Sequence, residues 1–320
     1  MLPDVLLILA GLAALFVGGD SLVKGAARLA STLGISPLVV GLTVVAFGTS
    51  VPELLVSINA ASAGVSDIAL GNVLGSNITN IGLILGVSAL IFPITVEWRL
   101  IRQEIPLMII VSVVVLAMAR DGVISQADGL LLVVGFVSFT VVSLVLASRS
   151  RIVKQDIHEF SEQEHITPAA QINTVREALR LVAGIVLLGV GAGWTVDGAT
   201  AVARSMGISE FIIGVTLVAF GTSLPELVAS VIAAMRRESD IAIGNVVGSN
   251  IANLLAILGI TASLHPIPVA SNLLIFEFPV MIAFALLLVP FVLRRQVLRR
   301  PAAVLLFTSY VGFIAATILR

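Results

Sequence analysis

The chain has 320 residues, of which 58% are hydrophobic and only 12% are charged, and its mean hydropathy is +1.13. Soluble domains are about half apolar and about a quarter charged, so this composition indicates a polytopic membrane protein. A net charge of −1 without a basic segment gives no basis for nucleic-acid binding. The lack of cysteine excludes disulfides, thiolate metal sites and cysteine nucleophiles.

Ten apolar segments are long enough to cross about 30 Å of hydrocarbon as helices. The first lacks the basic start and the cleavage site of a signal peptide, so we expect it to be retained. In chain order, the predicted spans cover residues 3–30, 37–63, 68–91, 103–119, 127–147, 176–203, 210–234, 241–263, 273–293 and 302–319.

A polar linker, residues 148–175, separates two units of five predicted spans each, residues 1–147 and 176–320. With the N-terminus outside, 15 Lys and Arg residues fall on the cytosolic side and three fall outside. This bias predicts that both termini face outward and that the linker is cytosolic. The 15 residues are Lys24, Arg28, Arg99, Arg102, Arg149, Arg151, Lys154, Arg176, Arg180, Arg236, Arg237, Arg294, Arg295, Arg299 and Arg300.

The two units contain one repeated sequence. Residues 41–86 align without a gap on residues 214–259, an offset of 173, and 29 of 46 positions are identical. Each unit has an odd number of predicted spans, so the second copy must enter the membrane upside down. This predicts an inverted repeat, an arrangement that places a binding site near the bilayer midplane.

The second and seventh predicted spans each carry a polar cluster in the middle. The sequences are Gly-Thr-Ser-Val-Pro-Glu at residues 48–53 and Gly-Thr-Ser-Leu-Pro-Glu at residues 221–226. Proline removes a backbone hydrogen bond and clashes with the preceding turn, so Pro52 and Pro225 predict broken helices in both spans. A break at membrane depth is tolerated where it is packed in protein or lines a wet cavity.

Polar side chains at helical spacing predict four stripes that face a common centre. Two stripes end at glutamates, and two step by four along the third and eighth spans. Glycines 71, 75, 244 and 248 allow close contact beside the latter two. The stripes are Thr49, Ser50 and Glu53; Thr222, Ser223 and Glu226; Asn72, Ser76 and Asn80; and Asn245, Ser249 and Asn253.

Two carboxylates surrounded by hydroxyl and amide oxygens suit a hard cation such as Ca²⁺, which takes six to eight oxygen ligands. The same oxygens can hold Na⁺ instead, and this competition is a route to exchange. An ionisable residue at mid-span is by default functional. For the hydroxyls, the alternative is a bond back to their own helix, and for the asparagines it is a clamp between helices.

The repeated Gly-Thr-Ser-x-Pro-Glu and Gly-Asn-x-x-Gly-Ser-Asn segments, within residues 41–86 and 214–259, resemble the two repeat motifs of the calcium:cation antiporter superfamily. The likeness is greatest to prokaryotic sodium/calcium exchangers and extends over nearly the whole chain. It implies alternating access in the plasma membrane of a bacterium or archaeon, with sodium influx driving calcium extrusion. It also implies Ca²⁺ and Na⁺ as transported ions and no cofactor.

Carried over by position, the resemblance implies twelve ion ligands. Asn253 departs from family members that have Asp there, which argues weakly against potassium co-transport. The short linker has no room for the regulatory domain of eukaryotic exchangers. The implied ligands are Glu53 and Glu226, the hydroxyls of Thr49, Ser50, Thr222 and Ser223, the carbonyls of Ala46 and Ala219, and Ser76, Asn80, Ser249 and Asn253.

Three other functions fit less well. Calcium or another divalent cation could exchange for protons if burial raises the pKa of the glutamates. Broken helices meeting at a closed midplane favour alternating access over a channel. An intramembrane enzyme lacks support, because the sequence has no His-Glu-x-x-His motif and no cysteine nucleophile.

Oligomeric state is not predicted. Asp20 and Lys24, four residues apart, predict a local ion pair.

Overall fold

The computed structural model describes residues 2–149, 173–208 and 219–319. The described chain is helical apart from four strands of two residues each. Most of the predicted linker and the start of the seventh predicted span lie outside the described residues.

The elements of the first unit follow the predicted spans closely. They are α1 (Leu2–Leu33), α2 (Pro37–Val40), η1 (Gly41–Val45), α3 (Ala46–Thr49), α4 (Val51–Ser62), α5 (Ser66–Thr79), η2 (Asn80–Leu85), α6 (Gly86–Ile91), β1 (Ile94–Thr95), η3 (Leu100–Glu104), α7 (Ile105–Met118), η4 (Ala119–Asp121), β2 (Val123–Ile124) and α8 (Gln126–Arg149).

The described part of the second unit has the same order of elements, with one exception. Its elements are α10 (Thr174–Ser205), α12 (Ala219–Thr222), α13 (Leu224–Met235), α14 (Ser239–Ala252), η7 (Asn253–Ile257), α15 (Leu258–Leu264), β3 (Ile267–Pro268), η8 (Leu273–Glu277), α16 (Phe278–Arg295), β4 (Val297–Leu298) and α17 (Arg300–Leu319). The exception is α16, which continues through the position equivalent to η4.

Within the described residues, eight helices are long and apolar enough to cross a membrane, and a bent pair makes a ninth candidate. The bent pair joins Pro37–Thr49 to Val51–Ser62 at an angle of 44°. The break falls at Ser50, and Pro52 lies in the first turn of α4, where its missing N–H is tolerated. Ser223 and Pro225 occupy the equivalent positions before and within α13, which is the described end of the seventh predicted span.

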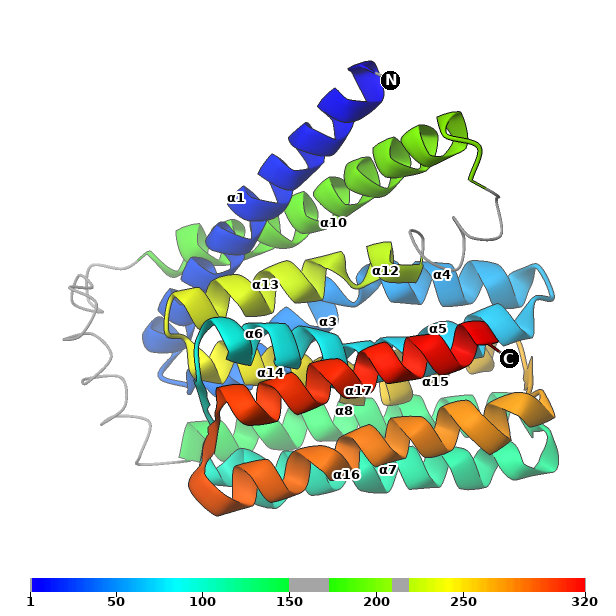
Figure 1. Cartoon of the computed structure of the whole chain (residues 1–320). Helices are drawn as coiled ribbons and strands as arrows, with labels where there is room; N and C mark the ends of the chain where they lie inside the picture. Colours follow the sequence, from blue (N-terminus) through cyan, green and yellow to red (C-terminus); the bar gives the residue numbers. More distant parts are fainter. Residues whose placement is uncertain (1, 150–172, 209–218, 320) are drawn as a thin grey trace.

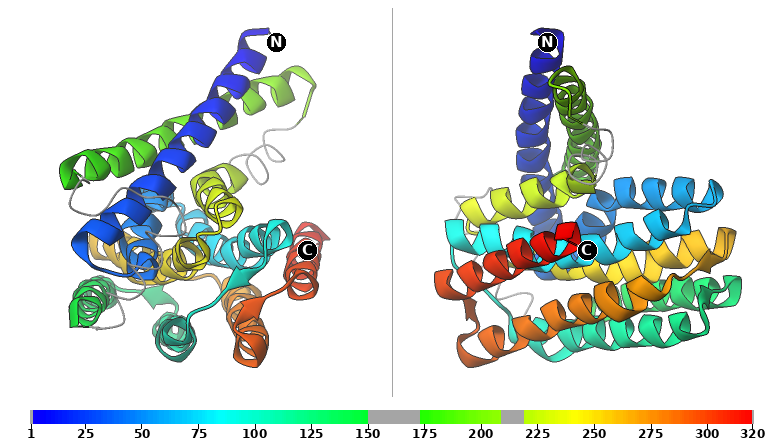
Figure 2. Two further views of the ribbon diagram at one scale, coloured as in Figure 1. Left: turned by 90° about the vertical axis from the view of Figure 1, so that its left-hand side faces the viewer. Right: turned by 45° about the vertical axis from the view of Figure 1, so that its right-hand side comes forward.

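The helices α1 and α10 cross as a pair on one side of the bundle, and the N-terminal part of α1 projects beyond it (Figure 1). Both helices lie across the direction of the stacked helices (Figure 2, right). They pack antiparallel through glycines spaced by seven: 11, 18 and 25 on α1, and 184, 191 and 198 on α10. A Cβ at Gly184 would lie 2.6 Å from the backbone nitrogen of Leu22. Only glycine therefore permits this approach of the two backbones.

The centre of the bundle is formed by α5 with η2 and α6, and by α14 with η7 and α15. The apolar window of the second of these continuous helices is 100% buried, and that of the first is 72% buried. At Gly248 a Cβ would lie 2.4 Å from the carbonyl oxygen of Leu42, so α14 packs directly on η1. The close contact predicted at Gly244 and Gly248 is confirmed, whereas no atom of the described chain, their own helix apart, lies within 4 Å of a Cβ at Gly71 or Gly75.

Contacts between the two units are reciprocal. β1 pairs antiparallel with β4, and β2 pairs antiparallel with β3, so each short ladder joins one unit to the other. The π-helical segments η2 and η3 recur 173 residues later as η7 and η8. Such segments interrupt the regular hydrogen-bond pattern and are frequent at functional sites.

Candidate ion-binding site

The two glutamates lie just after the breaks, and each is held by the opposite unit. The Ser50 hydroxyl donates to Oε1 of Glu226 at 2.8 Å, and the Ser223 hydroxyl donates to Oε1 of Glu53 at 3.3 Å. Both glutamates are 1% exposed. In the described chain, Oε2 of each is buried without a hydrogen-bond partner. A buried carboxylate oxygen in this state is costly unless a cation or a water molecule meets it.

The carbonyl of Ala46 lies one turn before Ser50, whose hydroxyl binds Glu226. Its oxygen accepts from the Ser50 backbone nitrogen at 3.2 Å, the Thr49 hydroxyl at 3.2 Å and the Ser249 hydroxyl at 3.4 Å. Thr49 therefore makes the bond to its own helix that was the alternative to a ligand role, and it also contacts Oδ1 of Asn245 at 3.2 Å. The break thus brings oxygens of both units to one place.

The remaining implied ligands are placed less fully. Thr222, Ser223 and Ser76 are buried, on or next to α12 and on α5. Ala219 begins α12, and no contact of its carbonyl is described.

Asn72 and Asn245 act as clamps between helices. The amide nitrogen of Asn72 donates to the backbone oxygen of Glu53 at 3.0 Å and to the Ser57 hydroxyl at 2.9 Å. Asn245 makes the equivalent bonds to the backbone oxygen of Glu226 at 3.3 Å and to Ser230 at 2.9 Å. Each amide therefore holds the backbone at a glutamate against the neighbouring helix. Neither Ser57 nor Ser230 is predicted from the sequence to be part of this contact.

Asn80 and Asn253 lie where α5 becomes η2 and where α14 becomes η7. The amide nitrogen of Asn80 donates to Oδ1 of Asn250, and that of Asn253 donates to Oδ1 of Asn77, both at 3.0 Å. The Oδ1 atoms of Asn80 and Asn253 are buried without a partner in the described chain. Together with the two carboxylate Oε2 atoms, they make four buried acceptors without donors, which suits a cation.

The described residues contain no group of three or more His, Cys, Asp or Glu side chains able to hold a metal ion. The site has two acids, and its other oxygens are neutral. Oxygen ligands of this kind favour alkali and alkaline-earth cations over transition metals.

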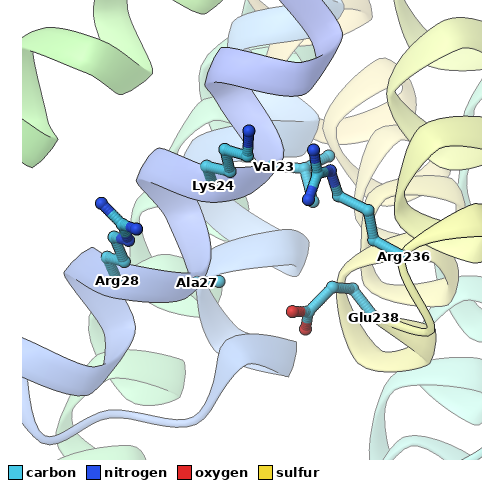
Figure 3. A pocket seen from close by; sticks show the side chains of 6 residues that line it. All are labelled: Val23, Lys24, Ala27, Arg28, Arg236 and Glu238. Carbon is cyan, nitrogen blue, oxygen red and sulfur yellow. The ribbon is translucent and has the colours of Figure 1, made fainter. Parts of the chain in front are cut away.

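Some predicted cytosolic basic residues gather at one end of α1. Lys24, Arg28 and Arg236 line a small pocket with Glu238, Val23 and Ala27 (Figure 3). The predicted Asp20–Lys24 ion pair is present at 2.8 Å, and Asp20 also binds Arg236 at the end of α13. Arg28 and Arg180 both reach Glu177, at 3.4 and 3.0 Å. The helices α1, α10 and α13 are therefore tied together at this end.

Comparison with known proteins identifies relatives over the whole chain. The model of the sodium/calcium exchanger protein family matches residues 4–145 and 177–319. A candidate antiporter, CaxA of Alkalimonas amylolytica, is 38% identical over 98% of both chains. The sodium/calcium exchanger MaX1 of Methanosarcina acetivorans is 36% identical over 97% of both chains.

A solved structure of the sodium-calcium exchanger NCX_Mj has a TM-score of 0.84 to this chain, at 33% identity and with 98% of each chain covered. The two matched segments of the family model leave out only the linker and the ends. On the family model, the full-length relatives and the shared fold, the chain belongs to the sodium/calcium exchanger protein family.

Proposed function

We propose that this membrane cation antiporter exchanges Ca²⁺ for Na⁺ by alternating access. The observation that carries the proposal is the crossed pair of hydrogen bonds from Ser50 to Glu226 and from Ser223 to Glu53. Because each carboxylate is held by the opposite unit, a movement between the units alters the site itself. The names of MaX1 and NCX_Mj support sodium and calcium as the exchanged ions.

The architecture we propose has ten spans in two inverted units of five, with the second and seventh spans broken. The reciprocal strand pairs and the equivalent breaks at Ser50 and Ser223 support it. The distribution of Lys and Arg supports termini outside and a cytosolic linker. Such an arrangement places the glutamates near the midplane, where inverted-repeat transporters bind their ions.

The ion ligands we propose are the twelve positions implied by the resemblance. The strongest support comes from four of the buried oxygens that have no partner in the described chain, those on Glu53, Glu226, Asn80 and Asn253. Two carboxylates balance one Ca²⁺, and Na⁺ ions compete for the same oxygens. The neutral amide of Asn253 supports exchange without potassium.

Exchange for protons is the second candidate, because a buried carboxylate can carry a proton. It predicts that a pH gradient alone drives calcium uptake. The two candidates therefore differ in a single measurement on the same vesicles.

The test uses proteoliposomes of the full chain, loaded with sodium and diluted into sodium-free calcium medium. We expect calcium uptake that stops when sodium is equal on both sides, is unchanged by removing potassium and is not driven by a pH gradient. Empty liposomes are the control. Uptake driven by the pH gradient and indifferent to sodium would overturn the proposal.

A further inference from the structure

The strongest unexplained feature is a ring of four buried asparagines at the contact between α5–η2 and α14–η7. Asn77 and Asn250 lie one helical turn before Asn80 and Asn253, and all four are about 1% exposed. Two of the amides reach across to the other two, each at 3.0 Å. The ring is reciprocal between the two units.

The orientation of Asn77 is forced by its neighbours. Its Nδ2 lies 3.4 Å from the backbone oxygen of Asn250 and 3.5 Å from Sδ of Met281 on α16. Both neighbours only accept hydrogen bonds, so the amide must present its NH₂ group there. Its Oδ1 then points at Asn253.

Asn250 is oriented in the same way. Its Nδ2 lies 3.4 Å from the backbone oxygen of Asn77 and 3.5 Å from Sδ of Met108 on α7. Its Oδ1 therefore accepts the bond from Asn80. Met108 and Met281 are themselves equivalent under the offset of 173 residues, so both units supply the same set of acceptors.

The orientations of Asn77 and Asn250 in turn determine those of Asn253 and Asn80, the two amides proposed as ion ligands. Asn253 must turn its NH₂ toward Oδ1 of Asn77, and Asn80 must turn its NH₂ toward Oδ1 of Asn250. Their own Oδ1 atoms are left as the buried acceptors without partners. An amide that rotated freely would offer NH₂ to a cation for part of the time, which repels it.

We infer that Asn77 and Asn250 are positioning residues that set the cation affinity of the site by orienting Asn253 and Asn80, each across the boundary between the units. The inference rests on the proposed ion-binding function. Asn77 and Asn250 themselves do not contact the ion. Their effect reaches it only through the amide that each one holds.

A double-mutant cycle tests this specifically. Calcium binding to the purified full chain is measured by titration calorimetry in sodium-free buffer. We expect Asn77→Leu and Asn253→Ala each to weaken binding by about tenfold, the size of one hydrogen bond to a charged group. The double variant should be only about tenfold weaker, because no amide remains to be oriented.

The cross pair is the internal control. Asn77→Leu combined with Asn80→Ala should weaken binding by the product of the two single effects, since Asn80 is oriented by Asn250. Ser88→Ala removes a buried hydroxyl on α6 that has no partner in the described chain, and it should bind as the wild type does. Asn250→Leu should couple to Asn80→Ala in the same way that Asn77 couples to Asn253.

If the leucine variant fails to fold, Asn77→Ser removes the same acceptor with a smaller, polar side chain. Equal coupling of Asn77 to Asn253 and to Asn80, or no coupling at all, would overturn the inference while wild-type calcium binding persists. Absence of calcium and sodium binding to the wild type would instead refute the proposed function.

Discussion

The α1–α10 pair and the α5–α14 centre are both close helix contacts, but they are made by opposite means. Glycines bring α1 and α10 together backbone to backbone, and their apolar windows are only 28% buried. Asparagines and serines hold the centre, where the window of α14–α15 is wholly buried. The first contact depends on the absence of side chains, and the second depends on which atom each side chain presents. Mutations should therefore separate stability from ion binding.

The largest effect should come from the centre. Glu226→Gln or Glu53→Gln removes one of the two carboxylate charges while keeping the shape of the side chain. We expect exchange to fall by about 100-fold or more, as for the loss of one partner from a buried ion pair. Sodium-driven calcium uptake in proteoliposomes measures it.

The matched control is Asp67→Asn, which removes an exposed carboxylate from the first turn of α5. It should leave uptake unchanged, and the glutamine variants should unfold in detergent at or above the wild-type temperature. Uptake at the wild-type rate in both glutamine variants would refute the ligand assignment.

Much of this centre could be predicted from the sequence, because two copies of one motif constrain each other. The breaks beside Pro52 and Pro225 and the convergence of Glu53 with Glu226 follow from proline chemistry and helical spacing. The hydrogen bonds from Ser50 to Glu226 and from Ser223 to Glu53 cannot be predicted in this way. Helical spacing shows which residues share a face of one helix, but it does not show which helix of the other unit that face contacts.

The sequence also does not predict which asparagines join helices and which leave an oxygen available to an ion. Asn72 and Asn80 fall on one predicted stripe, yet Asn72 clamps α4 whereas Asn80 leaves an oxygen free of donors. The π-helical turn beginning at Asn80 shifts the helical register there. The contact between α1 and α10 does have a signal in the sequence. Glycines 11, 18 and 25 recur at 184, 191 and 198, the same offset of 173 as the motif, and this spacing predicts a close contact between the two helices.

The glycine contact should show the second effect, on stability. In Gly184→Ala the new Cβ would lie 2.6 Å from the Leu22 nitrogen and 2.8 Å from the Gly18 oxygen, and neither backbone atom can move without separating the helices. We expect a loss of about 1–3 kcal/mol, as for other overpacked contacts. Thermal unfolding in detergent measures it.

Gly189→Ala is the control on the same helix, because no described atom lies within 4 Å of its Cβ position apart from its chain neighbours and the backbone of its own helix. Alanine is the better helix former by about 1 kcal/mol, so this variant should be as stable as the wild type or slightly more so. If both variants unfold at the same temperature, close backbone contact does not limit the packing of α1 on α10.

The smallest effect should come from the ion pair that ties α1 to α13, and so joins the two regions. Asp20 and Arg236 are 26% and 30% exposed, and Asp20 keeps Lys24 when Arg236→Gln removes its other partner. Partly exposed pairs contribute about 0.2–1 kcal/mol and are screened by salt. The loss of stability should therefore shrink when choline chloride, which does not compete as sodium would, is raised to high concentration. Arg236→Lys, which keeps the charge, should lose less. A loss that exceeds that of Gly184→Ala and persists at high salt would mean that charge, rather than backbone shape, holds the α1–α10 pair to the centre.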